Sequence, residues 1–112
     1  MEPRWKLCDI ALIFGDQRIT SKLLQILHIE DMDISIDVCH IDSGWHGYCD
    51  VDGDNPSNAD VNINEDLSYD DKVVALAHEL IHVCQFANQI PLEEDDAYAY
   101  ENILANMARA LV

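Results

Sequence analysis

Hydrophobic and polar residues alternate in two stretches of the chain, and this alternation predicts two β-strands. The first stretch covers 32–41, and its apolar side carries Ile34, Ile36, Val38 and His40. His40 is therefore expected to be a buried core histidine. The second stretch covers 59–67, where Val61 and Ile63 share one side and polar residues occupy the other. Its polar positions favour an edge strand. A short strand is also expected at 46–51, between turn-forming residues.

Helical spacing appears in three other stretches. Residues 18–28 predict an amphipathic helix, and 69–88 form a run that is apolar nearly all round, which is typical of a buried helix. Ser68, with Asp71 three residues later, resembles a capping box at the start of that helix. A last helix is expected to begin at 92–94. Its predicted buried face consists of Ala97, Tyr100, Leu104, Met107 or Ala108, and Leu111.

These elements predict an α+β fold. The apolar run 5–14 is either a strand or a short helix, because periodicity does not decide for so short a run. No linker, repeat or low-complexity tract divides the 112 residues, and this length is enough for one modest core. We therefore expect a single domain over 1–112, with a small, mostly antiparallel sheet packed on the helix at 69–88 and on the last helix.

The formal net charge of −16 is extreme for a chain of this length. No Lys or Arg occurs between Lys22 and Lys72, so direct nucleic-acid binding is disfavoured. A non-catalytic acidic binding module, such as a nucleic-acid mimic or inhibitor, stays open as an alternative function. The sequence has no apolar run of membrane-spanning length and no secretory signal, and its four cysteines form no CxxC pair. A cytoplasmic location with reduced thiols is expected.

The sequence His78-Glu79-Leu80-Ile81-His82 lies inside the predicted buried helix. Histidines four residues apart share a helix face and can bind one zinc ion. The glutamate of this H-E-x-x-H pattern can act as a general base on water at the metal. Burying these polar side chains without a partner would be costly, and a bound metal removes that cost.

A catalytic zinc site needs a third protein ligand. The acidic run 93–96 offers candidates at the start of the last helix, although acids also suit a helix N-terminus for electrostatic reasons. Relative to the predicted buried face, Glu93 and Asp96 point inward, whereas Glu94 and Asp95 point further away. Glu93 and Asp96 are therefore the predicted third ligands.

Together, these motifs resemble the zincin metallopeptidases, and among them the short gluzincins of bacterial and phage type. Those proteins pair an H-E-x-x-H helix with a downstream helix in which a Glu before an Ala binds the metal. The matching residues here are Asp96-Ala97-Tyr98-Ala99-Tyr100, with Asp96 in place of the Glu. The resemblance, which covers 59–108, implies a zinc metallopeptidase acting on a protein or peptide. It also implies that the strand at 60–66 pairs with the extended substrate.

The expected mechanism is hydrolysis of a peptide bond by metal-activated water, with Glu79 as general base. A donor must also stabilise the oxyanion. Tyr98, Tyr100 and His46 are the candidates, and Tyr100 is taken as the predicted catalytic residue.

Overall fold

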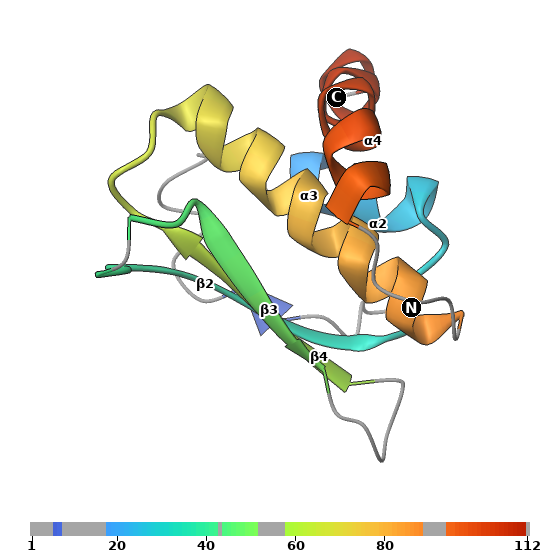
Figure 1. The fold of residues 1–112 in the computed structure, drawn as a ribbon. Helices are drawn as coiled ribbons and strands as arrows, with labels where there is room; N and C mark the ends of the chain where they lie inside the picture. Colours follow the sequence, from blue (N-terminus) through green and yellow to red (C-terminus); the bar gives the residue numbers. More distant parts are fainter. Residues whose placement is uncertain (1–5, 8–17, 43, 52–57, 89–93, 112) are drawn as a thin grey trace.

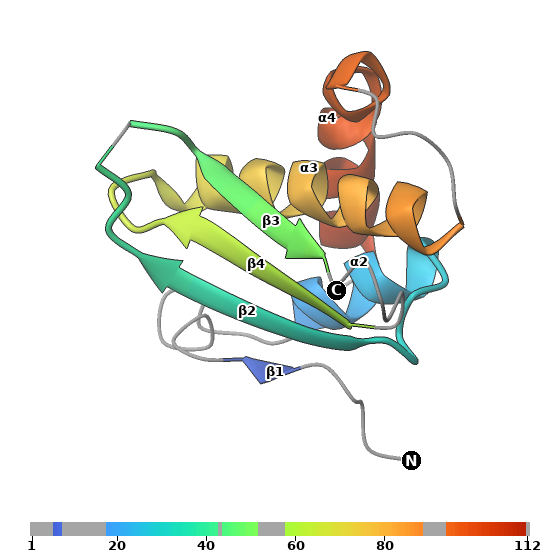
Figure 2. The same cartoon turned by 60° about the horizontal axis from the view of Figure 1, so that its bottom comes forward.

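In the computed structural model of the protein, the described helices all lie on one side of a four-stranded sheet (Figures 1 and 2). The structure describes residues 6–7, 18–42, 44–51, 58–88 and 94–111. The elements within these ranges are β1 (Lys6–Leu7), α2 (Arg18–Ile26), β2 (Asp33–Cys39), β3 (Gly47–Val51), β4 (Asn58–Asn64), α3 (Tyr69–Ala87) and α4 (Glu94–Ala110). α3 lies against the sheet, and α4 packs on α2 and α3. The α+β class is confirmed. Apart from β1, the predicted run 5–14 lies outside the described residues.

The strand order is β1-β2-β4-β3. β2 runs parallel to both β1 and β4, and β3 runs antiparallel to β4. The prediction of a mostly antiparallel sheet is therefore wrong, since the sheet is mixed. The predicted edge strand is also wrong, because β4 lies between β2 and β3, and β3 forms the edge. The polar residues of β4 lie on the sheet face turned away from the described helices, and a central strand has such a face as well as an edge strand.

The apolar side of the sheet faces the helices and forms the core. Ile34, Ile36 and Val38 of β2 are buried there, as are Val61 and Ile63 of β4. His40 does not join them, because β2 ends at Cys39. The His40 side chain is 60% exposed, and its Nε2 lies 2.7 Å from Oδ1 of Asp42. The predicted core histidine is thus a surface residue.

Helix α3 is buried because it has neighbours on opposite sides. It packs on β3 and β4 and also contacts α4 (Figure 1). This placement explains a sequence that is apolar nearly all round. The predicted cap is confirmed: the Ser68 hydroxyl accepts a hydrogen bond of 3.2 Å from the backbone N–H of Asp71.

Helix α4 buries Ala97, Leu104 and Ala108 as predicted, but its buried face does not include Tyr100. Its buried residues are Ala97, Leu104, Ala105 and Ala108. Tyr100 was predicted on this face but is 56% exposed, and Met107 and Leu111 are exposed as well. Spacings of three and four residues therefore place Glu94 and Glu101 in line with Ala97, Leu104 and Ala108. Within the described ranges, no helix combines the length and the apolar character needed to cross a bilayer.

Candidate metal centre

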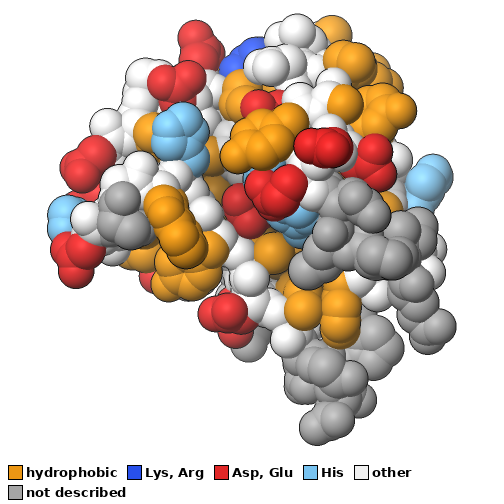
Figure 3. Space-filling model, viewed as in Figure 1, with side chains coloured by type: hydrophobic (Ala, Val, Ile, Leu, Met, Phe, Trp, Pro, Cys, Tyr) orange, Lys and Arg blue, Asp and Glu red, His pale blue; other side chains and the backbone are white. Residues whose placement is uncertain are grey.

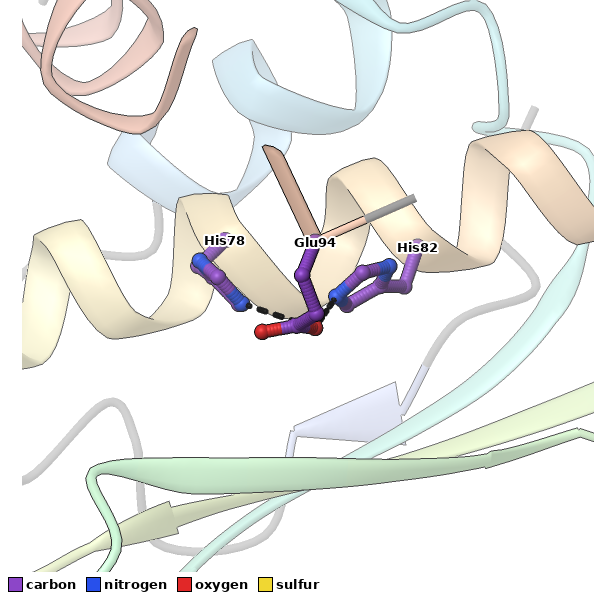
Figure 4. A group of neighbouring side chains, drawn as sticks. All are labelled: His78, His82 and Glu94. Atoms are coloured by element: carbon purple, nitrogen blue, oxygen red, sulfur yellow. Dashed lines mark hydrogen bonds and ion pairs between the residues drawn. The ribbon is translucent and has the colours of Figure 1, made fainter. Parts of the chain in front are cut away.

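Two histidines of α3 lie one turn apart on the same face of the helix. His78 and His82 are both buried, and their ring centroids are 4.9 Å apart with the planes at 79° (Figure 4). The predicted pair is therefore on one side of the helix, and its two rings can reach a shared ligand.

Each histidine uses its Nδ1 atom to bind a neighbouring oxygen. Nδ1 of His78 lies 2.8 Å from Oε2 of Glu101 on α4, and Nδ1 of His82 lies 3.0 Å from Oε1 of Gln85. A carboxylate and an amide oxygen can only accept hydrogen bonds, so both Nδ1 atoms donate. In the neutral rings, the Nε2 atoms then carry the free lone pairs. Metal-binding histidines are commonly held in this way.

Both Nε2 atoms face Glu94, the first residue of α4. Oε1 of Glu94 lies 3.5 Å from Nε2 of His78 and is also in contact with Nε2 of His82 (Figure 4). One ligand atom from each of the three residues lies within 4.8 Å of the others. Three acceptor atoms that face one another repel unless a proton or a cation lies between them. These residues therefore fit a divalent metal ion.

Among the described residues, a second group with possible ligand atoms comprises His40, Glu65 and Asp66. All three are exposed, and Nδ1 of His40 is 3.8 Å from Oδ2 of Asp66. Because the side chains of this second group are exposed, water competes with a metal ion for each of their ligand atoms. The histidines on α3 are buried. The group on α3 and α4 is thus the better candidate.

The structure brings Glu94 to the histidines rather than Asp96. The assignment of Asp96 depended on a buried face that included Tyr100, and the actual buried face is turned toward Glu94 and Glu101. Asp96 is exposed and is not among the residues that the structure brings together with the histidines, so the structure favours Glu94 in its place. Glu93 lies outside the described residues. Glu101 was missed, although its spacing from Ala97 and Leu104 signals an inward-facing carboxylate.

The group of His78, His82 and Glu94 opens into a cleft of about 870 Å³ between β3, α3 and α4. Glu79 lines this cleft beside the histidines, and its side chain is buried. Burial raises the Glu79 pKa above its ordinary value, while the two histidines and the Cys49 thiol act in the opposite direction. A carboxylate with a raised pKa is a stronger base for protons, as general-base catalysis requires.

β3 forms the wall of the cleft opposite the helices. A Cβ atom added to Gly47 would lie 3.5 Å from Cγ of Glu79 and 2.6 Å from the backbone oxygen of Asn62. Glycine thus allows β3 to approach both its neighbouring strand and the predicted base. Two residues further on, the Cys49 thiol donates a hydrogen bond to Glu79. Burial and the Glu79 charge raise the Cys49 pKa to about 12, so this thiol stays protonated.

The tyrosines take positions that differ from the prediction. Tyr100 is not among the residues that line the cleft. Tyr98 and His46 do line it, and the Tyr98 ring centroid lies 4.8 Å from that of His78. The structure therefore does not support Tyr100 as the catalytic donor.

No known protein family, curated protein or solved structure matches this chain.

Proposed function

We propose that this protein is a zinc-dependent peptidase. The observation that carries the proposal is the convergence of His78, His82 and Glu94 on one point beside the buried carboxylate of Glu79. The same group opens into a cleft large enough for part of a peptide. An ion-binding site and a base therefore meet where a substrate has access.

The ligand group favours zinc in a catalytic role. Two imidazoles and one carboxylate are typical of catalytic zinc sites, in which three protein ligands leave a position for water or substrate. A structural zinc site would be closed by four protein ligands, usually with cysteines. Cys49 is the cysteine that lines the cleft, and its hydrogen bond goes to Glu79.

A bound zinc ion would supply Lewis-acid activation of water and of the substrate carbonyl. Glu79 accepts the proton of the attacking water and delivers it to the amine that leaves. Glu101 and Gln85 keep the two imidazoles in the tautomer that binds a metal. Tyr98 and His46 line the cleft, and this position favours them as donors to the developing oxyanion. From the sequence, Tyr98, Tyr100 and His46 were the candidates for this role, and Tyr100 was chosen.

The substrate is proposed to lie along β3. Among the described strands, β3 pairs only with β4, and its residues line the cleft. An extended peptide can add to such an edge through backbone hydrogen bonds. This role was predicted for 60–66, but β4 is enclosed on both sides by other strands.

The test combines metal analysis with an assay of peptide hydrolysis. We expect about one zinc ion per chain in the wild type and in Glu79→Gln, since Glu79 is not a ligand. Hydrolysis of a mixed peptide library should occur in the wild type and fall by at least about a hundredfold in Glu79→Gln. Absence of zinc in a protein purified with zinc would overturn the proposal. Zinc without hydrolysis would favour a non-catalytic acidic binding module.

A further inference from the structure

The cleft is strongly acidic. Asp71, Glu79, Glu94 and Glu101 line it, and none of its described lining residues is Lys or Arg. The nearby cations are used elsewhere: the Lys72 amine donates to the backbone oxygen of Leu67, and the Arg109 guanidinium lies 3.6 Å from Asp70. A divalent ion would offset only part of this charge. A basic side chain is therefore the complementary ligand for the rest.

Aromatic rings add to this preference for cations. Trp45 and Tyr98 line the cleft and are 63% and 62% exposed. The faces of such rings attract ammonium and guanidinium groups. The Trp45 backbone is fixed, because its carbonyl accepts a 2.9 Å hydrogen bond from the side chain of the buried Asn64. In Figure 3, acidic and hydrophobic side chains gather around the histidine atoms near the centre of the face, and Lys and Arg are visible only at the upper edge.

Asp71 is the acid of the cleft that has no other role. It lies in the first turn of α3 on the stripe that continues through Val74, Ala75, His78 and His82, all of which line the cleft. Within the described part of the chain, its carboxylate forms no ion pair, whereas the neighbouring Asp70 pairs with Arg109. Asp71 is seven residues before His78, or about 10 Å along the helix axis. An extended peptide covers that distance in about three residues.

We propose that the cleft selects peptides with a lysine or arginine about three residues from the bond at the metal, and that Asp71 receives the basic group. This inference rests on the proposed function for the position of the cleaved bond. Trp45 and Tyr98 contribute through their ring faces, and the remaining cleft carboxylates attract the peptide over a longer range.

The experiment measures binding, so that it does not depend on cleavage. Two fluorescent peptides of identical sequence, one with lysine and one with acetyl-lysine, are titrated against zinc-loaded Glu79→Gln protein by fluorescence anisotropy. We expect the lysine peptide to bind about tenfold more tightly at low salt, with the difference shrinking as NaCl is added. Asp71→Asn in the same background should reduce the preference about fivefold.

Asp95→Asn is the matched control, because it removes the same charge from an exposed position in the first turn of a helix, outside the cleft and with no ion pair to break among the described residues. It should leave the preference nearly unchanged. Equal binding of the two peptides would overturn the inference, and so would equal effects of Asp95→Asn and Asp71→Asn, which would indicate net charge alone. Hydrolysis without a lysine preference would sink this inference but leave the peptidase proposal standing. A lysine preference without hydrolysis would leave the selection of basic peptides standing but would overturn the peptidase proposal, and with it the position given to the cleaved bond.

Discussion

The Nδ1 atom of His78 lies 2.8 Å from Oε2 of Glu101, across the contact between α3 and α4. The Glu101 side chain is only 18% exposed, so this hydrogen bond is largely shielded from water. It fixes the direction of the His78 ring and directs Nε2 toward Glu94. The packing of two helices and the orientation of a proposed metal ligand therefore depend on the same contact.

Replacing Glu101 by Gln should weaken zinc binding by about tenfold to a hundredfold, because the acceptor for the Nδ1 proton becomes weaker and uncharged. Competition with a zinc chelator measures the affinity. Asp95→Asn removes the same charge from an exposed position on α4 and serves as the control. Equal affinities in Glu101→Gln and the wild type would show that this contact does not orient the ligand.

The third ligand can be decided by comparing Glu94→Gln with Asp96→Asn. Glu94→Gln should reduce zinc affinity by more than about a hundredfold, since it removes a negatively charged ligand from a three-residue site. Asp96→Asn should bind zinc like the wild type, because Asp96 is outside the ligand group. Isothermal titration of zinc into the metal-free proteins gives both values, and the opposite pattern would restore the assignment made from the sequence.

Metal-free Glu79→Gln should melt at a higher temperature than the metal-free wild type at pH 7. Burial raises the Glu79 pKa in the folded state above 4.5, the ordinary value expected for the unfolded chain. The wild type therefore loses stability as the pH rises from about 4.5 through the folded-state pKa of Glu79. The reason is that Glu79 ionises more readily in the unfolded chain than in the folded protein. The difference between the two proteins should vanish near pH 4, where both side chains are neutral. Thermal melts in EDTA at the two pH values measure it, and a wild type that is the more stable at pH 7 would contradict this sign.

Cys49 should react with iodoacetamide more slowly at pH 8 than Cys39 or Cys84. Only the thiolate reacts, and a pKa of about 12 leaves very little of it. Glu79→Gln removes the charge that raises this pKa and should accelerate the reaction. Mass spectrometry of the alkylated peptides follows each cysteine separately. Fast alkylation of Cys49 in the wild type would mean that the thiol is not held beside Glu79.

Gly47→Ala should destabilise the protein by about 1–3 kcal/mol, because the new Cβ would lie 2.6 Å from the backbone oxygen of Asn62. Gly44→Ala is the comparison. Its φ of 74° is unfavourable for alanine, but nothing lies within 4 Å of the added atom, so the cost should be about 1 kcal/mol. Chemical denaturation gives both free energies of unfolding. A milder effect at Gly47 than at Gly44 would show that β3 can move away from β4.

Local patterns predicted the elements well because each pattern has a local physical cause. The alternation through Ile34 and Ile36 marks a strand with one covered face, and Ser68 marks the start of α3 through its own hydrogen bond. The order of the strands has no such local signal. β4 alternates like an edge strand, but the same alternation arises in a central strand whose second face is open.

The sequence predicted the part of the candidate site that lies on α3, where the inward face of the helix is unambiguous. It missed the part on α4, where the inward face is ambiguous. His78 and His82 share a face in any regular helix. In α4, the choice between Tyr100 and Glu101 as the inward residue decides which acids reach the histidines. Hydrophobicity favours Tyr100, but the small residues Ala97, Ala105 and Ala108 allow the helices to approach closely and place Glu101 at the contact. That decision depends on packing between helices, which one helix alone does not reveal.

Every described residue of the ligand group and its orienting partners comes from α3 or α4, whereas β3 supplies only the facing wall of the cleft. In the proposed peptidase, the residues that hold the ion are thus encoded apart from the strand along which the substrate lies, whereas Asp71 and Tyr98, which contact its basic side chain, are encoded with the ion-binding residues. Substitutions at Trp45, His46 and Tyr48 would then vary the wall that the substrate meets, whereas Gly47 and Cys49 lie against Glu79 and have to stay. A directed-evolution library limited to those three positions would explore new specificities of the proposed peptidase and leave the helical pair unchanged.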